Sequence, residues 1–222
     1  MPELRRKTDL IAIDLPGFGL STINDGPTVA SFNELIESTH DFIYRQKLGP
    51  VTLVGHSLGG WVASKLAVNH PSAVSRLILI NPAGVFTDGI ENLAAMFDVH
   101  ETKDVSTLLN TMWYRFPWYY APFVGSILRD LSRRRIGDFA RSIKREDFLS
   151  AELGSLRIPI ALLWGMEDRL LSADTISMLQ QWIPNLFVSR IEKCGHIPQL
   201  EAPERCARAI SERLDGKPHG MA

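Results

Sequence analysis

The chain has 222 residues, of which 45% are hydrophobic, and its formal net charge is −1 at pH 7. This length suits one domain with an insertion, and the hydrophobic content argues against a disordered chain. The near-neutral charge gives no support for nucleic-acid binding, and no apolar run approaches the ~20 residues that span a bilayer.

The first predicted elements surround a Leu-Pro-Gly loop. Residues 1–7 are predicted to end a helix that leads into a strand at residues 10–13. The loop that follows starts at Asp14, and its Leu-Pro-Gly sequel favours a turn-fixing role for that carboxylate. Residues 25–29 form a turn-rich connector. The capping box at residues 31–34 then starts a helix with a broad apolar face.

The most informative stretch is Gly-His-Ser-Leu-Gly-Gly at residues 55–60. It joins a predicted strand at residues 51–54 to a predicted helix at residues 58–69. A serine between glycines at a strand-to-helix turn is typical of a nucleophile elbow, which is tight and strained and exposes the hydroxyl. Ser57 is therefore the candidate nucleophile.

The flanking residues of this turn carry two further expectations. A bulky residue at Gly55 or Gly59 is expected to clash with neighbouring backbone. The amide of Leu58 is expected to point at the nucleophile beside the helix N-terminus, where negative charge is stabilised. Leu58 is therefore the candidate oxyanion-hole donor.

Residues 77–80 form another predicted strand, after which the strand pattern stops until about Ser155. The long stretch between them is helix-prone and holds the densest group of aromatic residues in the chain. Those residues either form a small core of their own or line a slot for an apolar substrate group, and aromatic stripes are more often core. The candidates for substrate binding are Trp113, Trp118 and Tyr119.

Two further strands precede the remaining candidates for catalysis. Asp168 follows an apolar run at residues 158–163, and His196 follows a strand at residues 186–191. Both side chains therefore lie beyond the carboxyl ends of parallel strands, where open α/β sheets place their sites. A serine hydroxyl needs a base and an orienting carboxylate, and this chain supplies them in the order Ser, Asp, His. Helices at residues 174–182 and 203–214 are expected to cover the sheet.

Four motifs in this order resemble those of the α/β-hydrolase superfamily, in the subgroup with a helical lid. They are the Asp-Leu-Pro-Gly loop at residues 14–21, the elbow around Ser57, the Trp-Gly-x-x-Asp sequence ending at Asp168, and Gly195-His196 with Glu201 and Pro203 behind it. The resemblance covers residues 10–214. It implies an α/β fold with a mostly parallel sheet flanked by helices. It also implies that Ser57 is the nucleophile, His196 the general base and acid, and Asp168 its orienting partner.

The resemblance divides the chain into three parts. Residues 1–83 and 151–222 correspond to the two parts of the hydrolase core, and residues 84–150 correspond to the helical lid.

One part of the family pattern is missing before Asp14. Relatives carry two or three further strands there, together with a His-Gly loop that supplies a second oxyanion-hole amide. This chain has no His-Gly before Asp14, and His219-Gly220 lies in a polar tail. A misplaced start, a truncated gene and a rearranged paralogue each explain the pattern. The missing segment predicts unpaired sheet edges and a weakened activity, because losing one donor costs about a hundred- to a thousandfold in rate.

Several polar residues compete with the candidates for catalysis. Cys194 lies two residues before His196 and is considered as a rival nucleophile. Because no second histidine lies nearby in the sequence, we interpret it as a free thiol. Glu167 and Asp174 are rivals to Asp168 by position. His56 is expected to pack against the sheet or to bond to backbone.

The remaining histidines do not predict a metal centre. His40, His70, His100 and His219 have no metal-ligand spacing between them, and the chain has no zinc or phosphate-loop pattern. We therefore expect neither a metal nor a cofactor.

The sequence thus predicts a serine hydrolase, carboxylesterase-like, acting on a small and largely apolar ester or related carbonyl compound. Carbon–carbon bond hydrolysis of ring-fission products is the closest alternative, and a non-catalytic relative that binds a ligand is the alternative from another class. The expected partner is a small-molecule substrate, without nucleic acid or membrane, and a homodimer is left open. The polar N-terminus and two cysteines indicate a reducing, cytoplasmic location.

Overall fold

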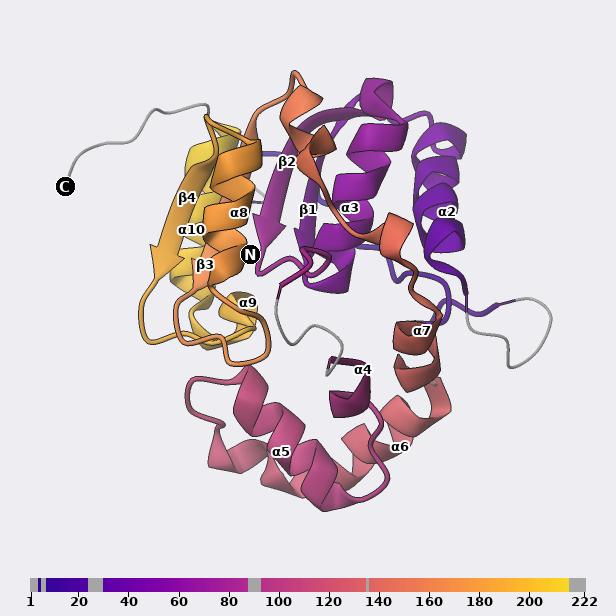
Figure 1. The fold of residues 1–222 in the computed structure, drawn as a ribbon, viewed down its shortest axis with the longest axis vertical. Coiled ribbons are helices and arrows are strands. Elements are labelled where there is room, and N and C mark those ends of the chain that lie inside the picture. The colour runs from indigo at the N-terminus through magenta and orange to yellow at the C-terminus, as the bar shows by residue number, and fades with distance from the viewer. Residues whose placement is uncertain (1–3, 5–6, 24–29, 88–92, 135, 216–222) are drawn as a thin grey trace.

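The computed structural model describes residue 4 and residues 7–23, 30–87, 93–134 and 136–215. Within these residues four parallel strands form one sheet in the order β1-β2-β3-β4, with helices on both faces (Figure 1). The strands are β1 (Val51–His56), β2 (Val74–Ile80), β3 (Ile160–Gly165) and β4 (Phe187–Ile191). The fold is therefore the predicted α/β architecture, and the strands expected after residue 50 are confirmed.

The helices fall into two groups. Those around the sheet are α2 (Phe32–Arg45), α3 (Leu58–Asn69), α8 (Asp174–Trp182), α9 (Pro198–Glu201) and α10 (Pro203–Leu214). Those between β2 and β3 are α4 (Leu93–Met96), α5 (Thr102–Met112), α6 (Val124–Arg134) and α7 (Ile136–Ser142). Single 3₁₀ turns are η1 (Pro71–Ala73), η3 (Trp118–Phe123), η4 (Arg145–Asp147) and η5 (Ala151–Ser155). The helices predicted at residues 58–69, 174–182 and 203–214 have these bounds.

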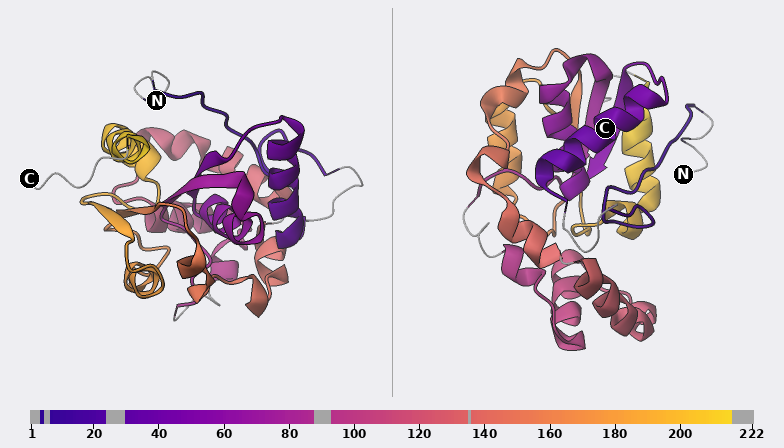
Figure 2. Two further views of the ribbon diagram at one scale, coloured as in Figure 1. Left: turned by 90° about the horizontal axis from the view of Figure 1, so that it is seen from above. Right: turned by 90° about the vertical axis from the view of Figure 1, so that its right-hand side faces the viewer.

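Alternation along β2 explains how the sheet is covered. Leu77 and Leu79 pack into the large core formed with α2, α3 and α8. Ile78 and Ile80 point the other way, into a smaller core with α10. Figure 2 shows α8 and α10 on opposite faces of the sheet. Because successive side chains of a strand alternate between faces, the second half of β2, from Leu77 to Ile80, is a continuous apolar run buried on both sides.

The outer strand β1 is covered less completely. It pairs with β2, and Val54 is the register partner of Ile78. Ile78 is fully buried, whereas Val54 is 47% exposed. Parallel partners project their side chains to the same face, so this difference means that α10 covers β2 on that face but does not reach β1.

The strand predicted at residues 10–13 is not formed. These residues have no strand pairing among the described residues, and Leu10, Ile11 and Ile13 are 47%, 58% and 41% exposed. An apolar run becomes a strand only where a neighbouring strand accepts its hydrogen bonds, and no described strand lies in register with it. The helix predicted at residues 1–7 and the connector at 25–29 lie largely or wholly outside the described residues.

The capping box predicted before α2 is confirmed. The Glu34 amide donates to Ser31 Oγ at 3.3 Å, and the Ser31 amide donates to Glu34 Oε2 at 2.7 Å. These bonds satisfy backbone donors that the first helical turn leaves free, so they fix where α2 begins.

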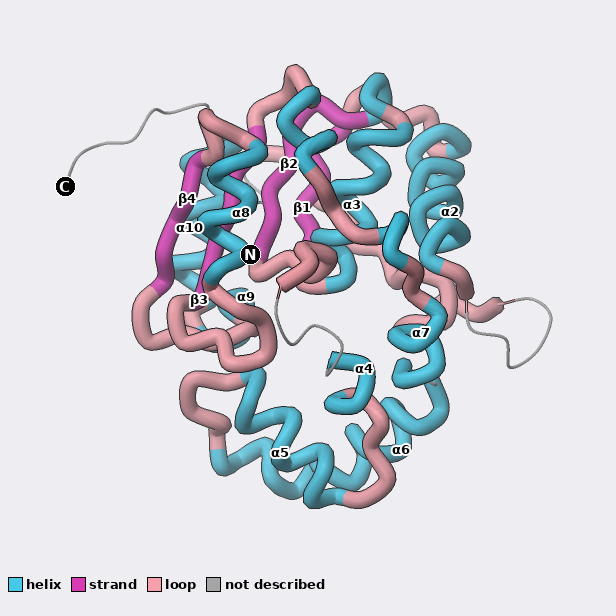
Figure 3. The backbone as a smooth tube through the Cα atoms, in the orientation of Figure 1, coloured by secondary structure: helices cyan, strands magenta, loops and turns pink. Residues whose placement is uncertain are grey.

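The segment between β2 and β3 is built from helices and loops, and it lies beyond the carboxyl ends of the strands (Figure 3). It has a small core of its own, which includes Val105, Leu108 and Trp113 from the α5 region and Val124 from α6. Ile197, which follows His196, belongs to the same core. The segment therefore packs directly against the loop that carries the candidate base, and its role as a lid stays a prediction.

Candidate active site

Polar side chains follow all four strands at one edge of the sheet. Ser57 comes directly after β1, Asn81 directly after β2, Asp168 shortly after β3, and His196 shortly after β4. Because the strands are parallel, their carboxyl ends meet at the same edge, and residues from distant parts of the sequence are brought together there.

The turn at Ser57 has the geometry expected of a nucleophile elbow. Ser57 has φ 51° and ψ −121°, a region that non-glycine residues rarely adopt. Its carbonyl accepts the amides of Gly60, Trp61 and Ala83 at 3.0–3.1 Å. These bonds hold the backbone in a strained conformation, of the kind that structures retain at functional sites.

The two glycine expectations at this turn have different outcomes. A Cβ at Gly55 would lie 2.6 Å from Cα of Gly60, so the expected clash at Gly55 is confirmed. A Cβ at Gly59 would meet no atom within 4 Å, so the expected clash there is wrong. The second close approach is at Gly60, where a Cβ would lie 2.9 Å from Cβ of Pro82. The loop after β2, together with the Gly55 carbonyl oxygen at 3.0 Å, therefore leaves no room for a side chain at Gly60.

His196 and Asp168 form a direct pair. His196 Nδ1 donates to Asp168 Oδ2 at 2.8 Å, and both side chains are buried, with exposures of 1% and 0%. The second oxygen, Asp168 Oδ1, accepts the amides of Leu170 and Leu171 at 2.8 and 3.0 Å. Since Nδ1 carries the proton that bonds to Asp168, Nε2 is left with a free lone pair.

The free nitrogen has no partner in the part of the chain that the structure describes. His196 Nε2 is buried and makes no hydrogen bond there, to Ser57 Oγ or to any other atom. An unsatisfied buried nitrogen costs stability, and such groups call for an explanation. In substrate-free structures the hydrogen bonds of catalysis are often long and tighten only with substrate bound.

Asn81 was not singled out by the sequence reasoning, yet it is part of this group. Its side chain is fully buried, and Nδ2 donates to Asp168 Oδ2 at 2.7 Å. Its Oδ1 accepts the amide of Gly165 at 3.0 Å, at the end of β3. Asn81 therefore holds the same carboxylate oxygen that accepts from His196. The signal that could have found it is its place directly after a buried strand, the position that also marks Ser57.

His56 makes a bond to backbone, as expected. Its Nε2 donates to the carbonyl oxygen of His196 at 2.7 Å, and the two rings lie 4.8 Å apart. Burial, together with repulsion from His196, lowers the pKa of His56 to about 4. His56 is therefore neutral near pH 7, and it braces the backbone of the neighbouring histidine.

The loop of His196 is fixed from several sides. The His196 amide donates to the carbonyl of Met112, at the end of α5, at 2.6 Å. The Glu201 carboxylate accepts the amides of Gly195 and Tyr114, each at 2.8 Å. Burial raises the pKa of Glu201 above its ordinary value. The helical segment and the histidine loop are thus held together by backbone bonds, which leave little freedom for the imidazole.

Leu58 is the first residue of α3. The first amides of a helix lack acceptors within the helix, and its N-terminus carries partial positive charge. The backbone at Leu58 therefore has the properties expected of an oxyanion-hole donor.

The rival residues are engaged elsewhere. Burial raises the pKa of the Cys194 thiol to about 12, so it carries almost no thiolate near neutral pH. Glu167 accepts the Cys194 amide at 2.8 Å, and Asp174 accepts the Ser172 hydroxyl at 2.9 Å. Cys194 and Cys206 are both free and buried. The structure therefore brings Asp168, not these residues, to His196.

The aromatic candidates separate into two environments. Trp113 is buried in the helical segment, and its ring packs against Phe116 and Tyr120 at 6.1 and 5.7 Å. Trp118 and Tyr119 lie on η3 and are 84% and 57% exposed. Trp113 is thus a core residue of this segment, whereas Trp118 and Tyr119 present their rings to solvent.

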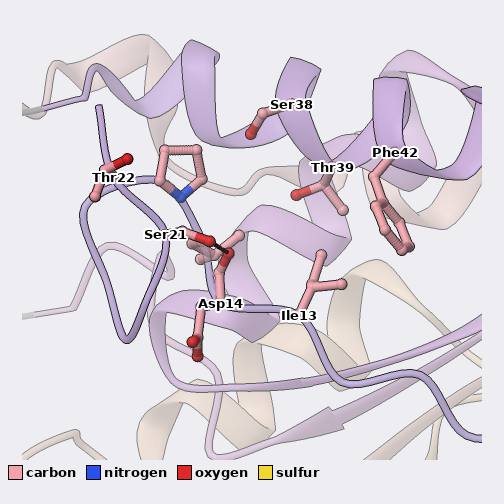
Figure 4. A pocket seen from close by; sticks show the side chains of 9 residues that line it. Ile13, Asp14, Ser21, Thr22, Ser38, Thr39 and Phe42 are labelled. Carbon is pink, nitrogen blue, oxygen red and sulfur yellow. Dashed lines mark hydrogen bonds between the residues drawn. The ribbon is translucent and has the colours of Figure 1, made fainter. Parts of the chain in front are cut away.

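A cavity of about 370 Å³ lies away from these groups, between the loop at residues 13–22 and α2 (Figure 4). It is bordered by Asp14, whose carboxylate accepts the Leu20 amide at 2.9 Å. Ser21 Oγ also donates to the Asp14 carbonyl at 2.8 Å. These bonds confirm the turn-fixing role expected of Asp14. The cavity does not include Ser57, Asp168 or His196, so it does not define the candidate active site.

Within the described ranges, every helix is too short or too polar to span a bilayer.

Comparison with known sequences identifies several hydrolases similar to this chain. Human monoacylglycerol lipase ABHD6 is 27% identical over 244 residues, which span 95% of this chain and 68% of the lipase. The 2-hydroxymuconate semialdehyde hydrolase of Pseudomonas sp. (strain CF600) is 27% identical over 234 residues, spanning 96% of this chain and 79% of that enzyme.

Solved structures show the same fold. A membrane phospholipase A, described as a bacterial virulence factor, superposes with a TM-score of 0.80 at 28% identity, covering 91% of this chain and 68% of that one. The 2-hydroxy-6-oxo-6-phenylhexa-2,4-dienoate hydrolase of Rhodococcus sp. strain RHA1 gives a TM-score of 0.84 at 22% identity, covering 97% and 83%. The family model for the alpha/beta hydrolase family matches residues 1–209. The chain therefore belongs to the alpha/beta hydrolase family.

Proposed function

We propose that this protein is a serine hydrolase that cleaves a small, largely apolar carboxylic ester through Ser57, His196 and Asp168. The observation that carries the proposal is the buried pair of His196 Nδ1 and Asp168 Oδ2 at 2.8 Å, beside an Nε2 without a partner among the described residues. A neutral imidazole paired in this way carries its proton on Nδ1 and has a free lone pair on Nε2. An imidazole in that tautomer, held at the edge of the sheet where Ser57 also lies, is suited to accept a proton from a hydroxyl.

The proposed reaction has two halves. His196 Nε2 takes the Ser57 proton as Oγ attacks the ester carbonyl, and the Leu58 amide donates to the oxyanion. The protonated His196 then gives its proton to the departing alcohol, which leaves an acyl group on Ser57. In the second half His196 deprotonates a water molecule, which releases the acid and restores Ser57.

The choice of an ester rests on the relatives. The sequence relatives named as monoacylglycerol lipases act on an ester bond, and they match 95% of this chain. The same triad chemistry serves other carbonyl compounds, so carbon–carbon bond hydrolysis is the second candidate. It is favoured by the 27% identical relative named 2-hydroxymuconate semialdehyde hydrolase.

A fluorophosphonate probe tests the nucleophile. The probe phosphonylates an activated serine hydroxyl and expels fluoride, so it reports chemistry without knowledge of the substrate. We expect rapid labelling of the wild-type chain and none of Ser57→Ala. No labelling of a well-folded wild-type chain would favour a non-catalytic relative that binds a ligand.

A panel of substrates separates the two candidate reactions. Esters of graded acyl length should be assayed beside a ring-fission product of the 2-hydroxymuconate type. We expect turnover of the esters, and turnover of the ring-fission product alone would replace the ester proposal. Trp118→Ala is informative on the same panel. If its exposed ring contacts the acyl group, the KM for longer esters rises a few-fold while kcat is retained.

A further inference from the structure

A second group of side chains able to bind a metal ion lies near the C-terminal end of α3, whereas the elbow lies at its N-terminal end. Glu37 and His40 are one turn apart on α2, so they share a face, and His70 is the residue that ends α3. Their nearest nitrogen and oxygen atoms all lie within 4.8 Å of one another. His70 Nε2 lies 3.1 Å from Glu37 Oε1, and the rings of His40 and His70 stack with centroids 3.7 Å apart at 4°.

From this arrangement we propose that Glu37, His40 and His70 form a binding site for a divalent transition metal ion, with Zn²⁺ as its reference ligand. Two imidazoles and one carboxylate are a donor set that zinc uses in proteins, with a fourth position left for water. The two imidazoles favour zinc, copper or nickel over magnesium and calcium, which take oxygen ligands.

The required rearrangement is small. Tetrahedral zinc with bonds of about 2.0–2.1 Å places its ligand atoms about 3.4 Å apart, so donors within 4.8 Å need to approach by less than about 1.5 Å. Parallel stacked rings cannot both hold one ion in their planes, so one imidazole must also turn. Both movements need only side-chain rotation, since the backbones are fixed by two packed helices.

The surroundings allow an ion to enter. The side chains of His70 and Glu37 are 25% and 45% exposed, so water reaches the site. In the metal-free protein His70 Nε2 lies within hydrogen-bond distance of Glu37, and an ion bound at Nε2 would replace this contact while the neutral imidazole carries its proton on Nδ1.

The site is separate from the proposed chemistry. The helix α3 runs from Leu58 to Asn69 and His70 directly follows it, so the two ends lie about 18 Å apart along its axis. Sequence spacing gave no indication of this group, because His40 and His70 lie on different helices. Metal binding would join the middle of α2 to the end of α3 and stabilise the fold without contacting Ser57.

The test is a Zn²⁺ titration of the full chain without an affinity tag, followed by calorimetry. We expect one saturable site, a thermal midpoint that rises with Zn²⁺, and little response to Ca²⁺ or Mg²⁺. Co²⁺ should give the intense visible absorption of a four-coordinate ion. His40→Gln and His70→Gln should each weaken Zn²⁺ binding at least tenfold, and the double variant should abolish it.

His100→Gln is the matched control. His100 is an exposed histidine near one carboxylate, with its Nε2 3.6 Å from Asp98, and its loss should leave Zn²⁺ affinity unchanged. Thermal melts without metal establish that the variants fold, and Glu37→Gln supplies a further variant that keeps a hydrogen-bonding partner for His70. An absence of saturable binding, or equal affinity in the wild type and in the double or Glu37 variant, would overturn the proposal.

Discussion

The middle of the sheet and its β1 edge are built differently. The middle strands β2 and β3 are buried on both faces, between the α3–α8 layer and α10. On the face of β1 that corresponds to the α10 side of β2, Val54 is 47% exposed. The apolar residues 10–13, which precede the Asp14 loop, form no strand. The contrast shows that the strands carrying the candidate catalytic residues differ in how deeply they are buried.

Asp168 and Asn81 follow the well-covered middle strands β3 and β2, whereas Ser57 and His196 follow the outer strands β1 and β4, which are only partly buried. The carboxylate of Asp168 receives four hydrogen bonds, from His196, Asn81 and two backbone amides. The base and its carboxylate are thus preorganised by surrounding donors, a condition that lowers the reorganisation needed during reaction. On this comparison, substitutions around Asp168 should impair catalysis, while truncation of the exposed β1 side chain Val54 should be mild.

The largest expected effect comes from removing the base. His196→Ala should lower kcat by at least about a thousandfold, because Ser57 would lose its proton acceptor. Circular dichroism and a thermal melt should show a folded protein. A kcat within about tenfold of wild type in a folded variant would exclude His196 as the base.

A matched pair of alanine substitutions on β1 and β2 measures how differently the two strands are buried. Ile78 and Val54 are register partners on one face, with exposures of 0% and 47%. Ile78→Ala should lower the free energy of unfolding by about 2–5 kcal/mol, because it leaves a cavity under α10. Val54→Ala should cost less than about 1 kcal/mol, since its side chain is already half in water. Equal losses in urea unfolding would show that β1 is as well covered as β2.

The same contrast explains which parts of the structure were predictable. Strands β1 to β4 and helix α3 follow from apolar runs and from the glycines of the elbow, because each run has a neighbour that accepts its hydrogen bonds. The strand expected at residues 10–13 has the same kind of composition but no described neighbour, and composition alone does not supply one. The clash expected at Gly59 is absent, and the close approach lies one residue later at Gly60, where Pro82 makes a tertiary contact that the local sequence does not reveal.

The candidate site was predicted in part from the sequence, as the fold was. Motif order identified Asp168 and His196, and the structure places them 2.8 Å apart. Asn81 was missed because its role depends on the register of β2 with β3, which brings it beside Gly165 and Asp168. Its place directly after a buried strand marks the position, but its contacts with Asp168 and Gly165 cannot be read from a single sequence.

His56, the last residue of β1, bonds to the backbone of the His196 loop, and the pH dependence of stability tests that contact. Burial lowers the pKa of His56 to about 4, against about 6.5 in the unfolded chain. Between these values the unfolded chain binds the proton that the folded chain excludes, so stability falls as the pH is lowered from 6.5 towards 4. The loss is up to about 3 kcal/mol, at 1.36 kcal/mol per pKa unit.

His56→Gln isolates this contribution, because its side-chain amide can still donate to the His196 carbonyl. Urea unfolding of both proteins at pH 7 and pH 4.5 should show a loss that is smaller in the variant by about 2 kcal/mol. The same loss in both would mean that His56 is protonated in the folded protein and does not resist charging.

The last prediction concerns Asn81, which links the end of β3 to the Asp168 carboxylate. Asn81→Ala should remove one of the hydrogen bonds to Asp168 Oδ2 and leave the Gly165 amide without its acceptor. A lost bond to a buried charged group costs about 1–3 kcal/mol, so kcat should fall roughly 5- to 150-fold if the bond positions the carboxylate during reaction. A purely structural role would lower the thermal midpoint and leave kcat and its pH profile unchanged. Asn81→Asp sharpens the distinction, because a second carboxylate beside Asp168 favours the protonated form of the pair and should shift the pH dependence of kcat, whereas a residue that only fills space should not.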